Sequence, residues 1–115
     1  MVKSITSNFY PEIISSLPEA EIPLEGIQGW IAQGENFQIV FFDISPVGQL
    51  PPHSHAAQFG VVLEGEMTLT ITGESKSYSK GDTYYIPAGA EHSAEFHTPV
   101  KAIDFFAEPS RYHPK

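Results

Sequence analysis

A two-residue alternation of apolar and polar side chains begins near residue 19 and constrains the fold more than any other feature. In its clearest example, residues 66–72, three apolar side chains alternate with one glutamate and three threonines. Such a period places the apolar residues on one face of a β-strand. Many short strands separated by glycine and proline turns are typical of an all-β sandwich or closed barrel.

The same reasoning predicts the limits of the strands and turns. Eight strands are predicted, over residues 27–32, 36–44, 58–63, 66–72, 75–79, 83–86, 91–97 and 100–107. The turn signals are Gly34, Pro46 with Gly48, Gly65, Gly73 with Glu74, Gly81 with Asp82, and Pro87 with Gly89. Gly73 and Glu74 suit a two-residue hairpin turn with glycine first.

Little helix is expected. Pro11 suits the first position of a helix of one or two turns, and Pro18 would end it. The length of 115 residues suits a single domain. We expect an N-terminal arm over residues 1–25, helical or extended, a β-barrel over 26–108 and a C-terminal tail over 109–115.

Composition limits the partners and the chemistry. The chain has no cysteine, which excludes disulfides, thiolate metal sites and cysteine nucleophiles. Fourteen acidic against six basic residues give a net charge of −8, so neither nucleic acid nor an anionic membrane surface is an expected partner. Residues 1–14 contain no apolar run long enough for a signal peptide or membrane span. These features favour a soluble cytoplasmic protein that binds a small molecule.

Three histidines and a glutamine are spaced as metal ligands could be. His53 and His55 are two residues apart, so on one strand both would project to the same face. Gln58 opens the next apolar stretch, and His92 follows the Pro87 turn far along the chain. A barrel can hold a metal in this way, with ligands from distant strands. Surface histidines near a proline turn are the competing interpretation.

The residues around these ligands resemble the two motifs of the cupin superfamily. The first motif is matched by Gly48, His53, His55, Gln58 and Gly65. The second is matched by Gly81, Pro87, Gly89 and His92.

The resemblance extends over about residues 26–108 and implies a cupin jelly-roll barrel, the double-stranded β-helix. It also implies one divalent transition metal, bound by His53, His55, Gln58 and His92. Nitrogen and oxygen ligands fit Mn, Fe, Co, Ni, Cu or Zn.

Two positions depart from the cupin motifs. Gln58 stands where glutamate is usual, after a shorter gap, and Phe96 stands where the second motif usually ends in asparagine. Three imidazoles and an amide would leave the metal charge unneutralised, which favours a Lewis-acid role or capture of an anionic substrate. Alternatively, Gln58 only forms hydrogen bonds in the pocket.

Residues 58–66 are also similar to the pectin-degradation cupins, which convert unsaturated uronates to linear keto sugars. In that subgroup an Asp-x-Phe pair and a following arginine act on the substrate, and Asp104, Phe106 and Arg111 match them. The arginine comes one residue late, and Gly60 replaces a second pocket glutamine. These departures leave the substrate less well defined than the fold and the metal.

Physical reasoning leaves the roles of these three residues open. Asp104 lies in an apolar stretch, so it is either on an exposed edge or buried for a purpose such as proton transfer. Phe106 shares its face and is either core or a platform for a substrate. Arg111, the single arginine, is either solvated or clamps a carboxylate. His97 and His113 are expected on the surface.

Three functions compete. The first is a metal-dependent enzyme, isomerase- or hydratase-like, on a small polar or sugar-derived acid. The second is a three-histidine dioxygenase with a redox metal, and the third is a non-catalytic small-ligand-binding cupin. A homodimer is expected, because small open barrels leave strand edges and residues 9–14 carry more apolar surface than a solvated tail should.

Overall fold

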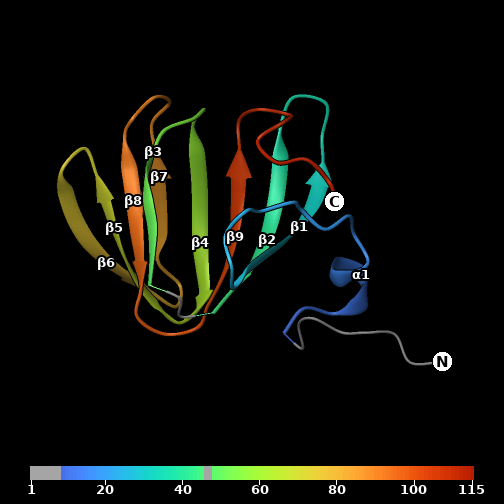
Figure 1. The fold of residues 1–115 in the computed structure, drawn as a ribbon, viewed down its shortest axis with the longest axis horizontal. Coiled ribbons are helices and arrows are strands. Elements are labelled where there is room, and N and C mark those ends of the chain that lie inside the picture. The colour runs from blue at the N-terminus through green and yellow to red at the C-terminus, as the bar shows by residue number, and fades with distance from the viewer. Residues whose placement is uncertain (1–8, 46–47) are drawn as a thin grey trace.

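The computed structural model describes residues 9–45 and 48–115 and shows an all-β fold of two antiparallel sheets (Figure 1). The strands are β1 (Ile27–Gln33), β2 (Gln38–Ile44), β3 (Gly48–His53), β4 (Gln58–Glu64), β5 (Glu66–Ile71), β6 (Glu74–Ser79), β7 (Thr83–Ile86), β8 (His92–Phe96) and β9 (Val100–Phe106). One sheet has the order β1-β2-β9-β4-β7, and the other β3-β8-β5-β6. The expected all-β jelly roll is confirmed.

The core lies between the two sheets, because each strand turns alternate residues inward. Every second residue of β2, from Gln38 to Ile44, is buried. In β5, Met67 and Leu69 are buried and Ile71 is half-buried, which confirms the alternation expected for 66–72. Adjacent β-strands therefore present apolar faces to one interior.

One strand was missing from the sequence-based prediction. Residues 48–53 form β3, although Pro51 and Pro52 argue against a strand. The strand lies at the edge of its sheet and has a register irregularity between Leu50 and His53, and proline is tolerated at such positions. Gly48 is the first residue of β3, whereas Pro46 of the predicted turn lies outside the described residues.

The hairpin between β5 and β6 turns one residue earlier than predicted. Ile71 pairs with Glu74, so Thr72 and Gly73 form the turn. Their φ angles are 46° and 86°. A two-residue hairpin turn with positive φ at both positions follows the twist of the flanking strands. Such turns prefer glycine, asparagine or aspartate, so the β-branched Thr72 is an unusual turn residue that the sequence did not indicate.

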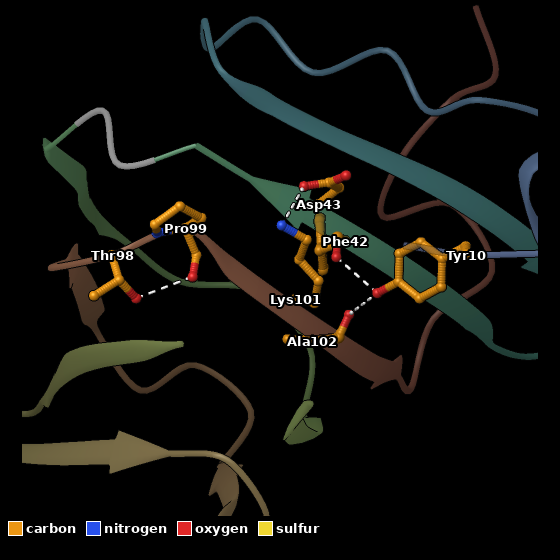
Figure 2. A network of polar contacts seen from close by, with 7 residues as sticks. All are labelled: Tyr10, Phe42, Asp43, Thr98, Pro99, Lys101 and Ala102. Carbon is orange, nitrogen blue, oxygen red and sulfur yellow. Dashed lines mark hydrogen bonds and ion pairs between the residues drawn. The ribbon is translucent and has the colours of Figure 1, made fainter. Parts of the chain in front are cut away.

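The beginning of the described N-terminal arm packs against the five-stranded sheet through Tyr10, whose ring meets those of Trp30 and Phe41. The helix α1 (Glu12–Ser15) begins after Pro11 and ends before Pro18, as expected. The Tyr10 hydroxyl donates to the carbonyl oxygens of Phe42 at 2.7 Å and Ala102 at 3.3 Å (Figure 2). Tyr10 thereby attaches the arm to β2 and β9. In the described residues no helix is long and apolar enough to cross a membrane.

Candidate metal centre

Three histidines converge at one end of the space between the sheets. His53 ends β3 and pairs with His92, the first residue of β8. His55 lies in the loop after β3, so the expectation that it shares a strand with His53 was wrong. The ring centroids are 4.2 Å apart for His53 and His92, 4.7 Å for His55 and His92, and 5.2 Å for His53 and His55.

The donor atoms of this cluster fit a metal ion. One nitrogen from each ring lies within 4.8 Å of the others. In each ring Nδ1 lies close to a backbone carbonyl oxygen one or two residues away, at 2.9 Å for His53, 2.7 Å for His55 and 2.9 Å for His92. A carbonyl oxygen only accepts, so Nδ1 must carry the proton. The Nε2 lone pair of each ring is then left for a metal, as in typical metal-binding histidines.

Burial also favours the metal-binding form of two of these imidazoles. Loss of hydration lowers the pKa of His53, and it lowers the pKa of His55 to about 4. The nearby positive charge of Arg111 acts in the same direction on both. Both rings are therefore neutral at pH 7, and only a neutral imidazole binds a metal. The chemistry of this cluster fits a divalent transition metal.

Gln58 and Asp104 form a pair that continues the site inward from the histidines. Asp104 is 2% exposed and lies in β9, between β2 and β4, so it is buried and not on an exposed edge. The Gln58 Nε2 donates to Asp104 Oδ2 at 2.6 Å. Because a carboxylate accepts, this bond fixes the amide with its nitrogen toward Asp104. The Gln58 oxygen is then the atom that remains for a metal.

Tyr84 is a site residue that the sequence did not reveal. Its buried hydroxyl donates to Asp104 Oδ2 at 2.8 Å and lies 3.0 Å from Oδ1. Gly60 lies between the two residues and is the cross-strand partner of both. A Cβ atom at Gly60 would overlap the Tyr84 ring and Asp104 Oδ2. The alternation in 83–86 indicates that Tyr84 faces inward, but not that it meets Asp104.

Burial makes the Asp104 carboxyl group a weaker acid than an exposed aspartate. Loss of hydration raises the pKa of its carboxyl to about 6, although the hydrogen bonds from Gln58 and Tyr84 act in the opposite direction. A carboxyl group with such a pKa can exchange a proton near neutral pH.

Phe106 and Arg111 lie on the same side as the histidines. Phe106 is 1% exposed, and its ring meets His55 edge-on at 5.5 Å between centroids. The Arg111 guanidinium carbon lies 4.5 Å from the Tyr112 ring centroid and 5.8 Å from that of Phe106. Among the described side chains, Arg111 Nε is the buried polar atom with no hydrogen-bond partner. Arg111 is thus partly enclosed, and not a solvated tail residue.

The C-terminal tail is fixed in this position by Gln38. This side chain, 1% exposed, donates from Nε2 to the carbonyl oxygen of Tyr112 at 2.8 Å. In return, the Tyr112 N–H donates to Gln38 Oε1 at 3.0 Å. Two hydrogen bonds to one buried amide hold the chain next to Arg111. By contrast, His97 and His113 are exposed, as expected.

These groups share one cavity. The polar groups of its lining come from His53, His55, Gln58, Tyr84, His92, Asp104, Arg111 and Tyr112. The remaining lining residues are apolar: Ile22, Leu24, Ile27, Phe42, Ile44, Leu50, Met67, Leu69, Ile86, Ala94, Phe96, Ala102 and Phe106. The cavity therefore brings together every site residue that the sequence indicated.

Known structures show where this architecture recurs. The structure of KdgF from Halomonas sp. superimposes on this one with a TM-score of 0.70 and 28% sequence identity. The comparison covers 80% of this chain and 88% of KdgF. The oxalate decarboxylase of Bacillus subtilis, a protein with Mn(II) centers, is similar with a TM-score of 0.71 and 21% sequence identity. That comparison covers 84% of this chain and 29% of the decarboxylase, and it supports the fold alone.

The curated relatives are longer proteins. Mannose-1-phosphate guanylyltransferase ManC of Salmonella typhimurium is 36% identical over 67 residues, which are 56% of this chain and 14% of that protein. Oxalate oxidase GF-2.8 of Triticum aestivum is 38% identical over 60 residues, or 44% of this chain and 27% of the oxidase. The chain thus spans little more than a quarter of these relatives at most. The cupin domain model matches residues 40–106, which include both motifs around the histidine cluster, and the chain belongs to the cupin family.

Proposed function

We propose that this cupin is a metal-dependent enzyme that acts on a small polar or sugar-derived acid by Lewis-acid and acid–base chemistry. The observation that carries the proposal is a buried carboxyl group, Asp104, in the same cavity as the three histidines. The resemblance of residues 58–66 and of Asp104, Phe106 and Arg111 to the pectin-degradation cupins supports a sugar-derived acid.

The metal would be held by Nε2 of the three histidines and by the oxygen of Gln58. When bound, it would supply a Lewis acid that polarises a substrate oxygen. Mn, Fe, Co, Ni, Cu and Zn all fit such donors. Manganese would be tested first, since the Bacillus subtilis oxalate decarboxylase of similar fold has Mn(II) centers. The proposed ligands are neutral, so an anionic substrate would offset the charge of the metal.

The chain supplies the proton transfer and the orientation. Asp104 would take a proton from a substrate hydroxyl or a carbon next to a carbonyl group, while Tyr84 and Gln58 hold its two oxygens in place. Arg111 would orient the acid through its guanidinium group, whose Nε lacks a partner among the described residues. Phe106 would form the apolar wall between them.

Asp104→Asn tests this proposal. The variant should retain its metal but lose turnover by roughly 10²–10⁴-fold, as is typical when a general base is removed. Metal content by elemental analysis would be measured together with turnover by the manganese-loaded protein, on a panel of small hydroxy and oxo acids and unsaturated and keto sugar acids. His97→Ala, which alters an exposed histidine outside the cluster, is the matched control. Full turnover by Asp104→Asn would disprove the assigned role.

A three-histidine oxidase or dioxygenase is the second candidate. The similarity to the wheat oxalate oxidase favours it, because that name describes an oxidation. Oxygen consumption by the iron-, copper- or manganese-loaded protein, with none by the zinc-loaded protein, would support this alternative over the first.

A further inference from the structure

The polar groups of the cavity are gathered at one end. On the four-stranded sheet, His92 is followed inward by Ala94 and Phe96, whose partners on β5 are Leu69 and Met67. Successive inward residues of a strand lie roughly 6–7 Å apart. On β8 and β5, two rows of apolar side chains therefore follow the histidine row, and all four line the cavity.

The lining of the opposite wall also changes from polar to apolar in this direction. On β9, Asp104 is followed by Ala102, whose neighbour on β2 is Phe42. Asp104 is the last titratable group on this wall, and the next lining residue along β2 is Ile44. Beyond Asp104, both sheets contribute only apolar side chains to the described lining.

The apolar end offers no hydrogen-bond partners for a ligand. Among the described lining residues there is no serine, threonine, asparagine or lysine, and the Tyr84 hydroxyl is already bonded to Asp104. A ligand hydroxyl placed there would lose its hydration without compensation. The cavity volume is about 70 Å³, against roughly 10–15 Å³ for a cavity that holds one water, so the ligand must be small.

The polar end, by contrast, suits an acid head group. Arg111 lies there with an unpaired Nε, beside the three histidines. We infer that the ligand is a short-chain hydroxy or oxo acid with an apolar tail, and not a polyhydroxylated acid. Its head would lie between Arg111 and the histidines, and its tail against Leu69, Met67 and Phe96. This inference rests on the proposed function and narrows it to acids with few hydroxyl groups.

Two four-carbon acids with the same head group provide the test. 2-Hydroxybutanoate and 2,3,4-trihydroxybutanoate share an α-hydroxycarboxylate and differ in the hydroxyl groups on carbons 3 and 4. Each would be titrated, in both configurations at carbon 2, into the zinc-loaded full chain by calorimetry. We expect 2-hydroxybutanoate to bind at least tenfold more tightly, because its tail needs no polar partner.

Variants of the apolar wall show whether it causes the preference. Leu69→Asn, nearly isosteric, should reduce the preference at least threefold by adding a hydrogen-bonding group. Thr68→Asn changes the next residue of β5, on the other face, and should leave the preference unchanged. If Leu69→Asn does not fold, as judged by its thermal unfolding, Met67→Gln provides the same comparison.

Each outcome decides the inference. Equal or tighter binding of the trihydroxy acid would overturn it while leaving the acid-binding site of the proposed function intact. A preference that persists in the folded Leu69→Asn and Met67→Gln variants would also overturn it. Binding of neither acid would overturn the inference and the assigned role of Arg111 together. Weaker binding of both acids by Arg111→Ala tests that role separately.

Discussion

The Tyr84 hydroxyl lies within 3.0 Å of both carboxylate oxygens of Asp104, across the space that Gly60 leaves open. Three neighbouring strands of one sheet, β7, β4 and β9, supply these residues. Tyr84 and Gln58 both donate to Asp104 Oδ2, so the carboxylate has a fixed orientation inside the cavity. The candidate acid–base group is thus positioned by two donors outside the histidine cluster.

Removing the Tyr84 hydroxyl should destabilise the fold through Asp104. Tyr84→Phe keeps the ring and deletes one donor to a buried carboxyl group, so we expect a loss of roughly 1.5–3 kcal/mol at pH 8, where the carboxylate is charged. Urea denaturation of the metal-free protein would measure it. Tyr85→Phe removes a hydroxyl from the adjacent residue, which is 60% exposed, and should cost less than about 0.5 kcal/mol. Equal losses in the two variants would contradict the assigned contact.

The sequence contained the local features of the site but not its long-range pairings. The resemblance of residues 81–92 to the second cupin motif indicated His92 as a metal ligand, and the structure places this residue in the histidine cluster. Strand β3 was missed because Pro51 and Pro52 are unfavourable in a strand interior, and only its place at a sheet edge makes them acceptable.

The burial of Asp104 could not be decided from the sequence either. An apolar stretch with one carboxylate fits both an edge strand and a central one. The difference depends on the pairing of β9 with β2 and β4, which lie about 40–65 residues earlier in the chain. The position of Arg111 likewise depends on hydrogen bonds between Gln38 and Tyr112, 74 residues apart.

The histidine cluster should determine metal content. We expect the protein to purify with about one transition metal per chain, and alanine at His53, His55 or His92 should each remove most of it. Gln58→Ala should have a smaller effect, because an amide oxygen is a weaker ligand than imidazole. Elemental analysis would measure the occupancy, with His113→Ala as the exposed control. Parent-level metal in a variant that lacks all three histidines would rule out this site.

Gly60 should tolerate no side chain. Gly60→Ala places a methyl group where the Tyr84 ring and Asp104 Oδ2 lie, and overpacking of this kind typically costs about 1–3 kcal/mol. Thermal or urea unfolding would measure the loss. In the Tyr84→Ala background the ring is absent, so the added cost of Gly60→Ala should fall. An unchanged cost in that background would show that the ring does not restrict this position.

We still expect a homodimer, but through a different surface from residues 9–14. Tyr10 is buried against the sheet, so part of the apolar N-terminal segment is covered within the chain. Phe59 is 49% exposed, and its cross-strand neighbours Tyr85 and Phe105 are 60% and 39% exposed. Light scattering should give a dimer mass at micromolar concentration, and Phe59→Lys should shift it toward the monomer. A monomer mass for the parent would contradict the expectation.

Asp104 and His55 should have opposite effects on the pH dependence of stability in the metal-free protein. The pKa of Asp104 is raised from 3.8 to about 6 on folding, so between these values the folded state keeps a proton that the unfolded state has lost. Its contribution to stability therefore falls as the pH rises through this window, by at most about 3 kcal/mol. The pKa of His55 falls from 6.5 to about 4, so its contribution rises with pH over a similar window, to a smaller extent because the ring is only half-buried.

The Asp104→Asn variant separates these two contributions. Without the carboxyl group only the rising contribution of the histidine remains, so the variant should gain stability relative to the parent between pH 4.5 and 7.5. Urea denaturation at both pH values, after removal of metal by chelation, would measure the change. His55→Ala should show the opposite trend relative to the parent, because it keeps only the falling contribution of Asp104. If parent and Asp104→Asn changed in parallel over this range, Asp104 could not be retaining its proton in the folded state.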